Sequence, residues 1–127
     1  MVSIVALEHV YIMILEMFMW TSPRALNAFG MTLELAEATI PMAANQGLYN
    51  GFLAAGLIWG LLHPNAVVGK QIQVFFVLCV VVAAIFGSIT VQVSILLVQG
   101  LPALLALLSL WLWRPRVSTQ PSIITET

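Results

Sequence analysis

The sequence predicts an all-α integral membrane protein, a four-helix bundle with a short interfacial helix between spans 1 and 2. Of its 127 residues, 61% are hydrophobic and only 7% are charged. Soluble domains carry about 25% charged residues, because a hydrated surface requires them. Four apolar stretches also recur, each near the ~20 residues that a helix needs to cross the bilayer. Lipid is therefore expected to cover most of one small domain.

Each span is closed by polar residues, prolines or a turn. The four spans are predicted over Val2–Trp20, Met42–Leu62, Ile72–Thr90 and Val91–Trp113. No charged loop separates the third span from the fourth, so a tight turn is expected near Gly87–Gln92. The spans form one transmembrane domain over residues 1–116, and the Ser/Thr-rich segment 117–127 is predicted to be a disordered tail.

Between the first two spans, the segment Asn27–Ile40 predicts a short helix lying at the membrane interface. Its centre, Leu33–Ala38, carries Glu34 and Glu37 three residues apart on one face. Pro41 would then end this helix or open the second span.

Small residues predict close packing between spans. Gly56 and Gly60 form a small-xxx-small motif in the second span, and Cys79, Ala83 and Gly87 repeat every four residues in the third. In lipid, such residues let helix backbones approach each other. They favour a compact bundle without selecting which helices are neighbours.

A proline within the fourth span predicts a kink. Pro102 has no N–H, so the carbonyl of Val98 loses its helical hydrogen bond. The neighbouring Gln99 is a candidate local hydrogen-bond partner.

The four basic residues orient the predicted spans. Lys70, Arg114 and Arg116 fall on the side that holds both termini, whereas Arg24 falls on the other side. Because Lys and Arg are enriched in cytoplasmic loops, both termini are expected in the cytoplasm. A net charge of −1 argues against a basic face for nucleic acid, so the expected partner is the lipid bilayer.

Three ionisable residues interrupt the first span. Such groups are costly in a bilayer and are functional-site candidates by default. His9, Met13, Glu16 and Trp20 recur at helical spacing and should share one face. Glu8 points about 100° away and is expected to reach water near the cytoplasmic end.

Amide and hydroxyl groups of two other spans fall at the level of Glu16. Candidate donors to the Glu16 carboxyl are Asn45, Tyr49 and Asn50, with Gln46, Gln92, Ser94 and Gln99 in the same half of the bundle. Burial disfavours a charged carboxylate whereas donors favour it, and a carboxyl balanced between the two can transfer protons. The candidate catalytic residues are Glu16 and His9. The candidate ligand-binding residues are Asn45, Gln46, Tyr49, Asn50, Gln99 and Trp20.

The same polar groups would also serve as interhelical hydrogen bonds that fix the helix register, each worth about 0.6 kcal/mol. Neither His9 nor His63 follows a glutamate at the three-residue spacing of a di-iron bundle site. The two histidines also lie at different depths, which is unfavourable for bis-histidine haem. We therefore expect no metal and no cofactor.

Three stretches, over residues 8–17, 44–54 and 98–103, resemble a family of small bacterial four-span membrane proteins catalogued as domain of unknown function 1304. The resemblance covers nearly the whole chain except about its last ten residues. It implies a four-span protein of the bacterial inner membrane. It carries no established activity and no site residues.

Three functions are compatible with these features, and whether the protein is an enzyme stays open. The first is a membrane enzyme or binding protein for a small lipophilic molecule, with Glu16 exchanging a proton and His9 as its relay; isomerisation or cyclisation of an isoprenoid-like lipid would need such parts. The second is a proton-coupled transporter, a dimer whose four-span layout is analogous to that of small multidrug exporters. The third is an accessory subunit of a larger membrane complex.

Overall fold

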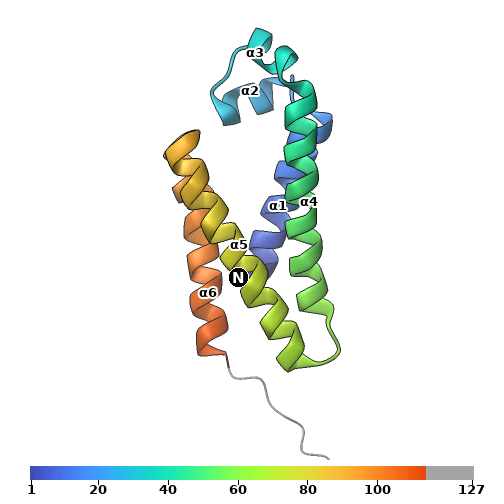
Figure 1. Cartoon of the computed structure of the whole chain (residues 1–127), viewed down its shortest axis with the longest axis vertical. Helices are drawn as coiled ribbons and strands as arrows, with labels where there is room; N and C mark the ends of the chain where they lie inside the picture. Colours follow the sequence, from blue (N-terminus) through green and yellow to red (C-terminus); the bar gives the residue numbers. More distant parts are fainter. Residues whose placement is uncertain (114–127) are drawn as a thin grey trace, which may run out of the picture.

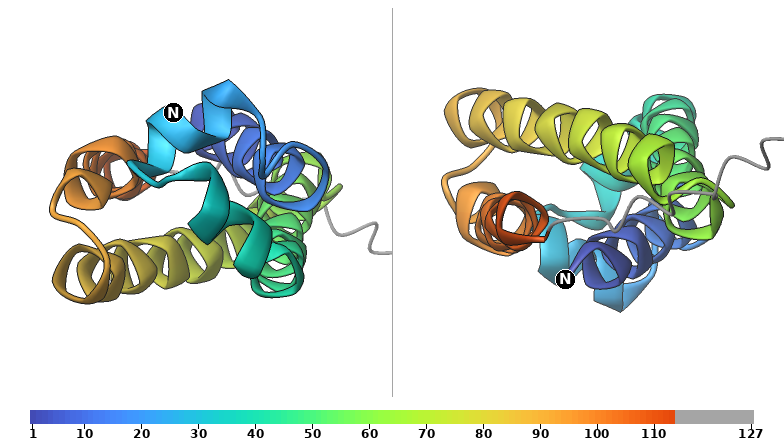
Figure 2. Two further views of the ribbon diagram at one scale, coloured as in Figure 1. Left: turned by 90° about the horizontal axis from the view of Figure 1, so that it is seen from above. Right: turned by 90° about the horizontal axis from the view of Figure 1, so that it is seen from below.

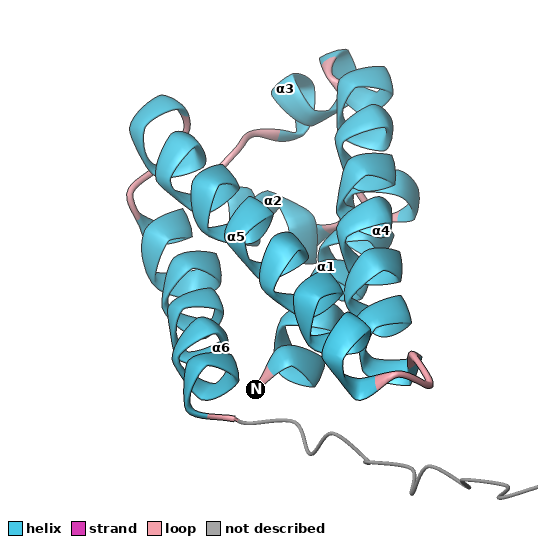
Figure 3. Cartoon of the chain, turned by 60° about the horizontal axis from the view of Figure 1, so that its bottom comes forward, coloured by secondary structure: helices cyan, strands magenta, loops and turns pink. Residues whose placement is uncertain are grey.

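The computed structural model describes residues 1–113, and every regular element within that range is helical (Figure 3). The elements are α1 (Val2–Phe18), α2 (Pro23–Phe29), α3 (Leu33–Ala38), α4 (Ile40–Leu62), α5 (Ala66–Thr90), η1 (Leu96–Gly100) and α6 (Leu101–Leu112). The fold is thus all-α, as predicted. The predicted tail over 117–127 lies outside the described residues.

Four long helical segments run alternately up and down, and two short helices lie at one end (Figure 1). Helix α1 packs most extensively against α4, and α5 packs against both α4 and the η1–α6 segment. Seen end-on, α2 and α3 lie between the tips of these helices (Figure 2). The end of α2 at Gly30 comes close to the side chain of Gln92 in the turn after α5.

One described helix, α5, is by itself both long and apolar enough to cross a membrane. Its best window has a mean hydropathy of 2.7, and only 22% of that window is buried. Helix α1 passes the same test only together with α2, from which it is bent by 117°. The polar residues near the start of α4 lower its hydropathy, and the segment Leu96–Leu112 is shorter. The four-span arrangement therefore stays a prediction.

The first helix and the segment that follows it differ from the predicted boundaries. Helix α1 ends at Phe18, two residues before the predicted end at Trp20. Two short helices then replace the single predicted one. The missed helix α2 has clear local signals: Ser22 caps its first turn by accepting from the N–H of Ala25, Pro23 opens it, and Gly30 ends it at φ 62°.

The turn between the last two long segments falls where it was predicted. Helix α5 ends at Thr90, and the next helical residues begin at Ser94. The predicted kink before Pro102 takes the form of the π-helix η1. There the N–H of Leu101 bonds to the carbonyl of Leu96, five residues back. The wider π-helical turn accommodates Pro102, which has no N–H to donate to the preceding turn.

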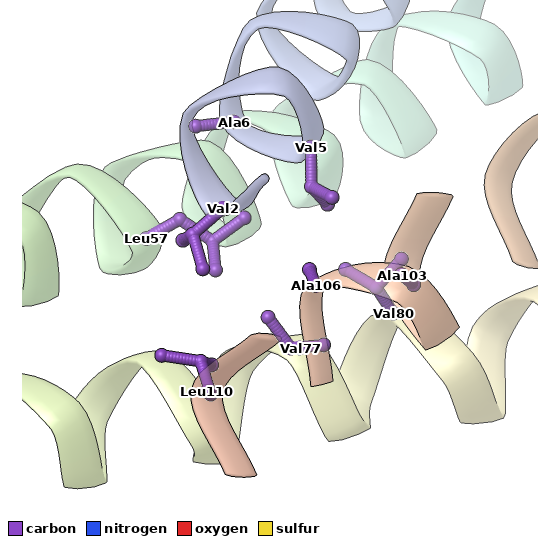
Figure 4. Packing of buried hydrophobic residues seen from close by; sticks show 9 residues of the cluster. All are labelled: Val2, Val5, Ala6, Leu57, Val77, Val80, Ala103, Ala106 and Leu110. Carbon is purple, nitrogen blue, oxygen red and sulfur yellow. The ribbon is translucent and has the colours of Figure 1, made fainter. Parts of the chain in front are cut away.

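The apolar core lies toward the end of the molecule that holds the N-terminus. Its buried members come from α1, α4, α5 and α6 and pack together as Figure 4 shows: Val2, Val5, Ala6, Leu57, Val77, Val80, Ala103, Ala106 and Leu110. Small and branched side chains dominate it, so the helices approach closely.

The predicted Gly56–Gly60 motif lies at the contact between α4 and α5. The ring of Phe76 covers Gly56, and a Cβ placed on Gly69 would lie 2.7 Å from the carbonyl oxygen of Gly60. The side chain of Gln73 donates to the same carbonyl at 2.9 Å. The stripe of Cys79, Ala83 and Gly87 is not a continuous contact, because Ala83 is exposed.

We predict that Gly69→Ala destabilises the fold by about 1–3 kcal/mol, because the new methyl group would meet backbone atoms that cannot move aside. Gly87→Ala is the matched control. There the nearest atoms, at 3.3 Å, belong to the flexible side chain of Ile95. Thermal unfolding followed by circular dichroism measures both. Equal melting temperatures for the two variants would contradict the close approach of α4 and α5.

Candidate functional site

The carboxyl of Glu16 is buried between α1 and α4, with 1% of the residue exposed. Its Oε1 accepts a hydrogen bond from Nε2 of Gln46 at 2.9 Å, and its Oε2 accepts one from Nδ2 of Asn50 at 2.7 Å. Both donors are neutral amides on α4. They hold the carboxyl by one bond to each oxygen and contribute no positive charge.

A glycine between the two amides makes this contact possible. A Cβ placed on Gly47 would lie 2.6 Å from the side chain of Met17 and 3.0 Å from Cβ of Glu16. Gly51 repeats the arrangement one turn later against the side chain of Met13. The missing side chains let α4 lie directly on α1. Gln46 and Asn50, four residues apart, then share the side of α4 that reaches Glu16.

Two of the expected donors do not contact this carboxyl. Asn45 and Tyr49 are exposed, and the hydrogen bonds come instead from Gln46 and Asn50. The correction follows from helix geometry, because residues 45 and 49 point about 100° away from residues 46 and 50. The Tyr49 ring packs edge-on against Phe52, with centroids 6.1 Å apart.

Trp20 lies beyond the end of α1 and is not one of the two donors to Glu16. Helix α1 ends at Phe18, so the helical spacing does not extend to Trp20. Its Nε1 donates to Oγ1 of Thr39 at 3.0 Å, and its ring lies 4.9 Å from that of Phe29. Trp20 therefore fastens α2 and the end of α3 near the top of α1.

Gln99 lies half-buried in η1 and is not one of the two donors to Glu16. Its place in the candidate site stays a prediction.

His9 lies within α1, seven residues before Glu16, and is 1% exposed. Its Nδ1 lies 2.8 Å from the carbonyl oxygen of Val5. Because a carbonyl only accepts, Nδ1 carries a proton, and Nε2 of the neutral ring is then an acceptor. The axial rise between His9 and Glu16 is about 10 Å, too far for direct contact.

Glu8 is half-buried, and its carboxyl group does not reach the surface of the described chain. Both of its carboxyl oxygens are shielded, and neither accepts a hydrogen bond from any part of residues 1–113. The prediction that this carboxyl reaches water is therefore wrong for the described chain. Within residues 1–113, no three His, Cys, Asp or Glu side chains gather where they could hold a metal ion.

Comparisons with known proteins place the chain among relatives of similar length. The model of the family described as "Protein of unknown function (DUF1304)" matches residues 3–111. The chain is 36% identical over 108 residues to "Uncharacterized protein YpaA" of Lactococcus lactis subsp. lactis (strain IL1403), covering 84% of this chain and 89% of that relative. No solved structure matches the chain.

We predict that Asn50→Ala lowers stability by about 1 kcal/mol, because one oxygen of a buried carboxyl loses its donor. Asn45→Ala is the matched control, since it makes the same chemical change at an exposed position of α4. Thermal unfolding of both variants should show a loss only for Asn50→Ala. A similar loss in a Glu16→Ala background would show that Asn50 acts elsewhere.

Proposed function

The chain belongs to the DUF1304 family, and we propose that it is a multi-pass membrane protein in which Glu16 binds a small lipophilic molecule and exchanges a proton with it. One observation carries the proposal: a buried carboxyl is held by two neutral amides, one of which belongs to an exposed side chain.

The apolar exterior supports the membrane location. Large hydrophobic side chains point outward on every long segment, among them Leu7, Phe18, Leu62, Ile89 and Trp111. Monomeric soluble proteins rarely expose extended apolar surfaces of this kind. We propose four spans, α1, α4, α5 and η1–α6, in the bacterial inner membrane. The Lys/Arg bias then puts both termini and the loop before α5 in the cytoplasm.

The choice of an ionisable carboxyl at Glu16 supports ligand binding or proton exchange over a purely structural role between two helices. An ionised carboxyl buried without a positive partner is costly, and amide donors offset only part of that cost. A proton or a cationic ligand would supply the missing charge. Because the Gln46 side chain is exposed, a ligand can replace its hydrogen bond without moving the backbone of α1.

His9 is the proposed relay on the same helix. It is buried about two turns before Glu16 and presents an acceptor nitrogen, Nε2, in the neutral ring. A ligand group or a water chain would have to bridge the distance between the two side chains. Proton transfer between Glu16 and His9 would serve either the isomerisation of a lipophilic substrate or the exchange of a proton for a bound ligand.

The two neutral amide donors of Glu16 also support a second candidate function, proton-coupled transport. A carboxyl that needs either a proton or a cation to balance its charge can alternate between them. That alternation is the exchange step of a proton-driven exporter of lipophilic cations.

Labelling with dicyclohexylcarbodiimide, which modifies protonated carboxyls in apolar surroundings, tests the proton-binding step. We expect mass spectrometry to find the label on Glu16, and tetraphenylphosphonium to slow its attachment by roughly tenfold or more. Glu34→Gln removes an exposed carboxyl and should leave this labelling unchanged. An unlabelled Glu16 in folded protein from acidic to neutral pH would contradict proton binding at this carboxyl, and labelling that the cation leaves unaffected would contradict the exchange of a proton for a lipophilic cation.

Proteoliposomes with a pH gradient separate the two candidate functions. Movement of tetraphenylphosphonium by the wild type and its loss in Glu16→Gln would assign transport. Binding at Glu16 without movement would assign a binding protein or an enzyme.

The proposed topology predicts opposite labelling of two engineered cysteines. In a Cys79→Ser background, Pro64→Cys should react with an impermeant maleimide only in inverted membrane vesicles, and Glu37→Cys only in intact cells. Both native residues are exposed, so neither substitution disturbs the core. Labelling of both cysteines from the same side would refute the four-span arrangement.

A further inference from the structure

An apolar groove lies on the outer face of α5 and α6, separate from Glu16. It has a volume of about 510 Å³, within the range of sites for small ligands, about 300–1,000 Å³. Its walls include Val74 of α5 and Leu104, Leu107 and Trp111 of α6, and Lys70 lies at one end. We propose that this groove binds one anionic phospholipid, with an acyl chain along the leucines and the phosphate at Lys70.

The chemistry of Lys70 selects the charge of the headgroup. Its Nζ donates to the backbone carbonyl of Trp113, which holds the ammonium group at the end of α6. An ammonium group has three N–H donors, and a neutral carbonyl uses one and leaves the positive charge uncompensated. A phosphate diester provides both acceptor oxygens and the opposite charge.

The apolar walls select an amphiphile over a free anion. Leu104 and Trp111 are half exposed or more, so the groove opens toward the surroundings of the helix pair. The indoles of Trp111 and Trp113 stand at the same end as Lys70, where aromatic rings and lysines mark the membrane interface. A lipid would therefore place its head and its chain on matching parts of one surface. This inference rests on the proposed membrane location, and it does not involve Glu16.

Native mass spectrometry of the full chain, with phosphatidylglycerol or phosphatidylcholine added in detergent, tests the inference. We expect one phosphatidylglycerol per chain, bound roughly tenfold more tightly than phosphatidylcholine. Lys70→Gln should remove this preference. Arg24→Gln should keep it, because it removes an exposed cation from α2, at the other end of the molecule.

Further variants and a competition experiment distinguish a lipid site from a site for free phosphate and from loss of folding. Leu104→Trp should block phosphatidylglycerol binding by filling the groove. This variant tests the site if Lys70→Gln fails to fold. Displacement of phosphatidylglycerol by millimolar inorganic phosphate, or equal loss in Lys70→Gln and Arg24→Gln, would overturn the inference. Glu16→Gln should bind phosphatidylglycerol like the wild type, so failure of the proposed function and failure of this site are distinguishable.

Discussion

The direct contact of α4 with α1 is the constraint on which the candidate site depends. Gly47 has no side chain, and only for that reason can the backbone of α4 lie against the side chain of Met17 and the Cβ of Glu16. That spacing brings the amides of Gln46 and Asn50 within hydrogen-bond distance of a carboxyl that the packing hides. Two helices separated by one more methyl group would leave Glu16 buried with its oxygens unpaired, which costs more than the bonds gain.

Apolar and polar buried side chains occupy different stretches of the molecule along α1. Toward the N-terminal end of α1, aliphatic side chains from four helical segments form a core without polar atoms. About one and three turns after Val5 along α1, His9 and Glu16 are equally buried but make hydrogen bonds. Because hydrogen bonds and charges act strongly where water is excluded, the second region can carry chemistry that the first cannot. Glu8, between them in sequence, is shielded without a donor from the described chain.

The two ends of the molecule differ: α2 and α3 lie at one end, and Lys70 lies at the other. Trp20, bonded to Thr39 and packed on Phe29, fastens α2 and the end of α3 beyond the carboxyl of Glu16. At the opposite end, Lys70 ties the start of α5 to the end of α6 and leaves a positive charge beside an apolar groove. The proposed proton-exchanging site and the proposed lipid contact are thus compatible in one small chain, because they use different helices and opposite charges.

The sequence by itself determined the helical class, the ends of α4 at Leu62 and of α5 at Thr90, the turn that follows and the exceptional position of Glu16, because hydropathy, prolines and the cost of buried charge are local properties. It also contained the Ser-Pro and Gly signals of α2, which were missed. Only the tertiary structure decided that Gln46 rather than Asn45 or Tyr49 meets the carboxyl, that Trp20 donates to Thr39, and that the carboxyl oxygens of Glu8 are shielded. These outcomes depend on where one helix stops and how a neighbouring helix is rotated about its axis. Such rotations are set by glycine contacts between distant segments, which no local pattern specifies.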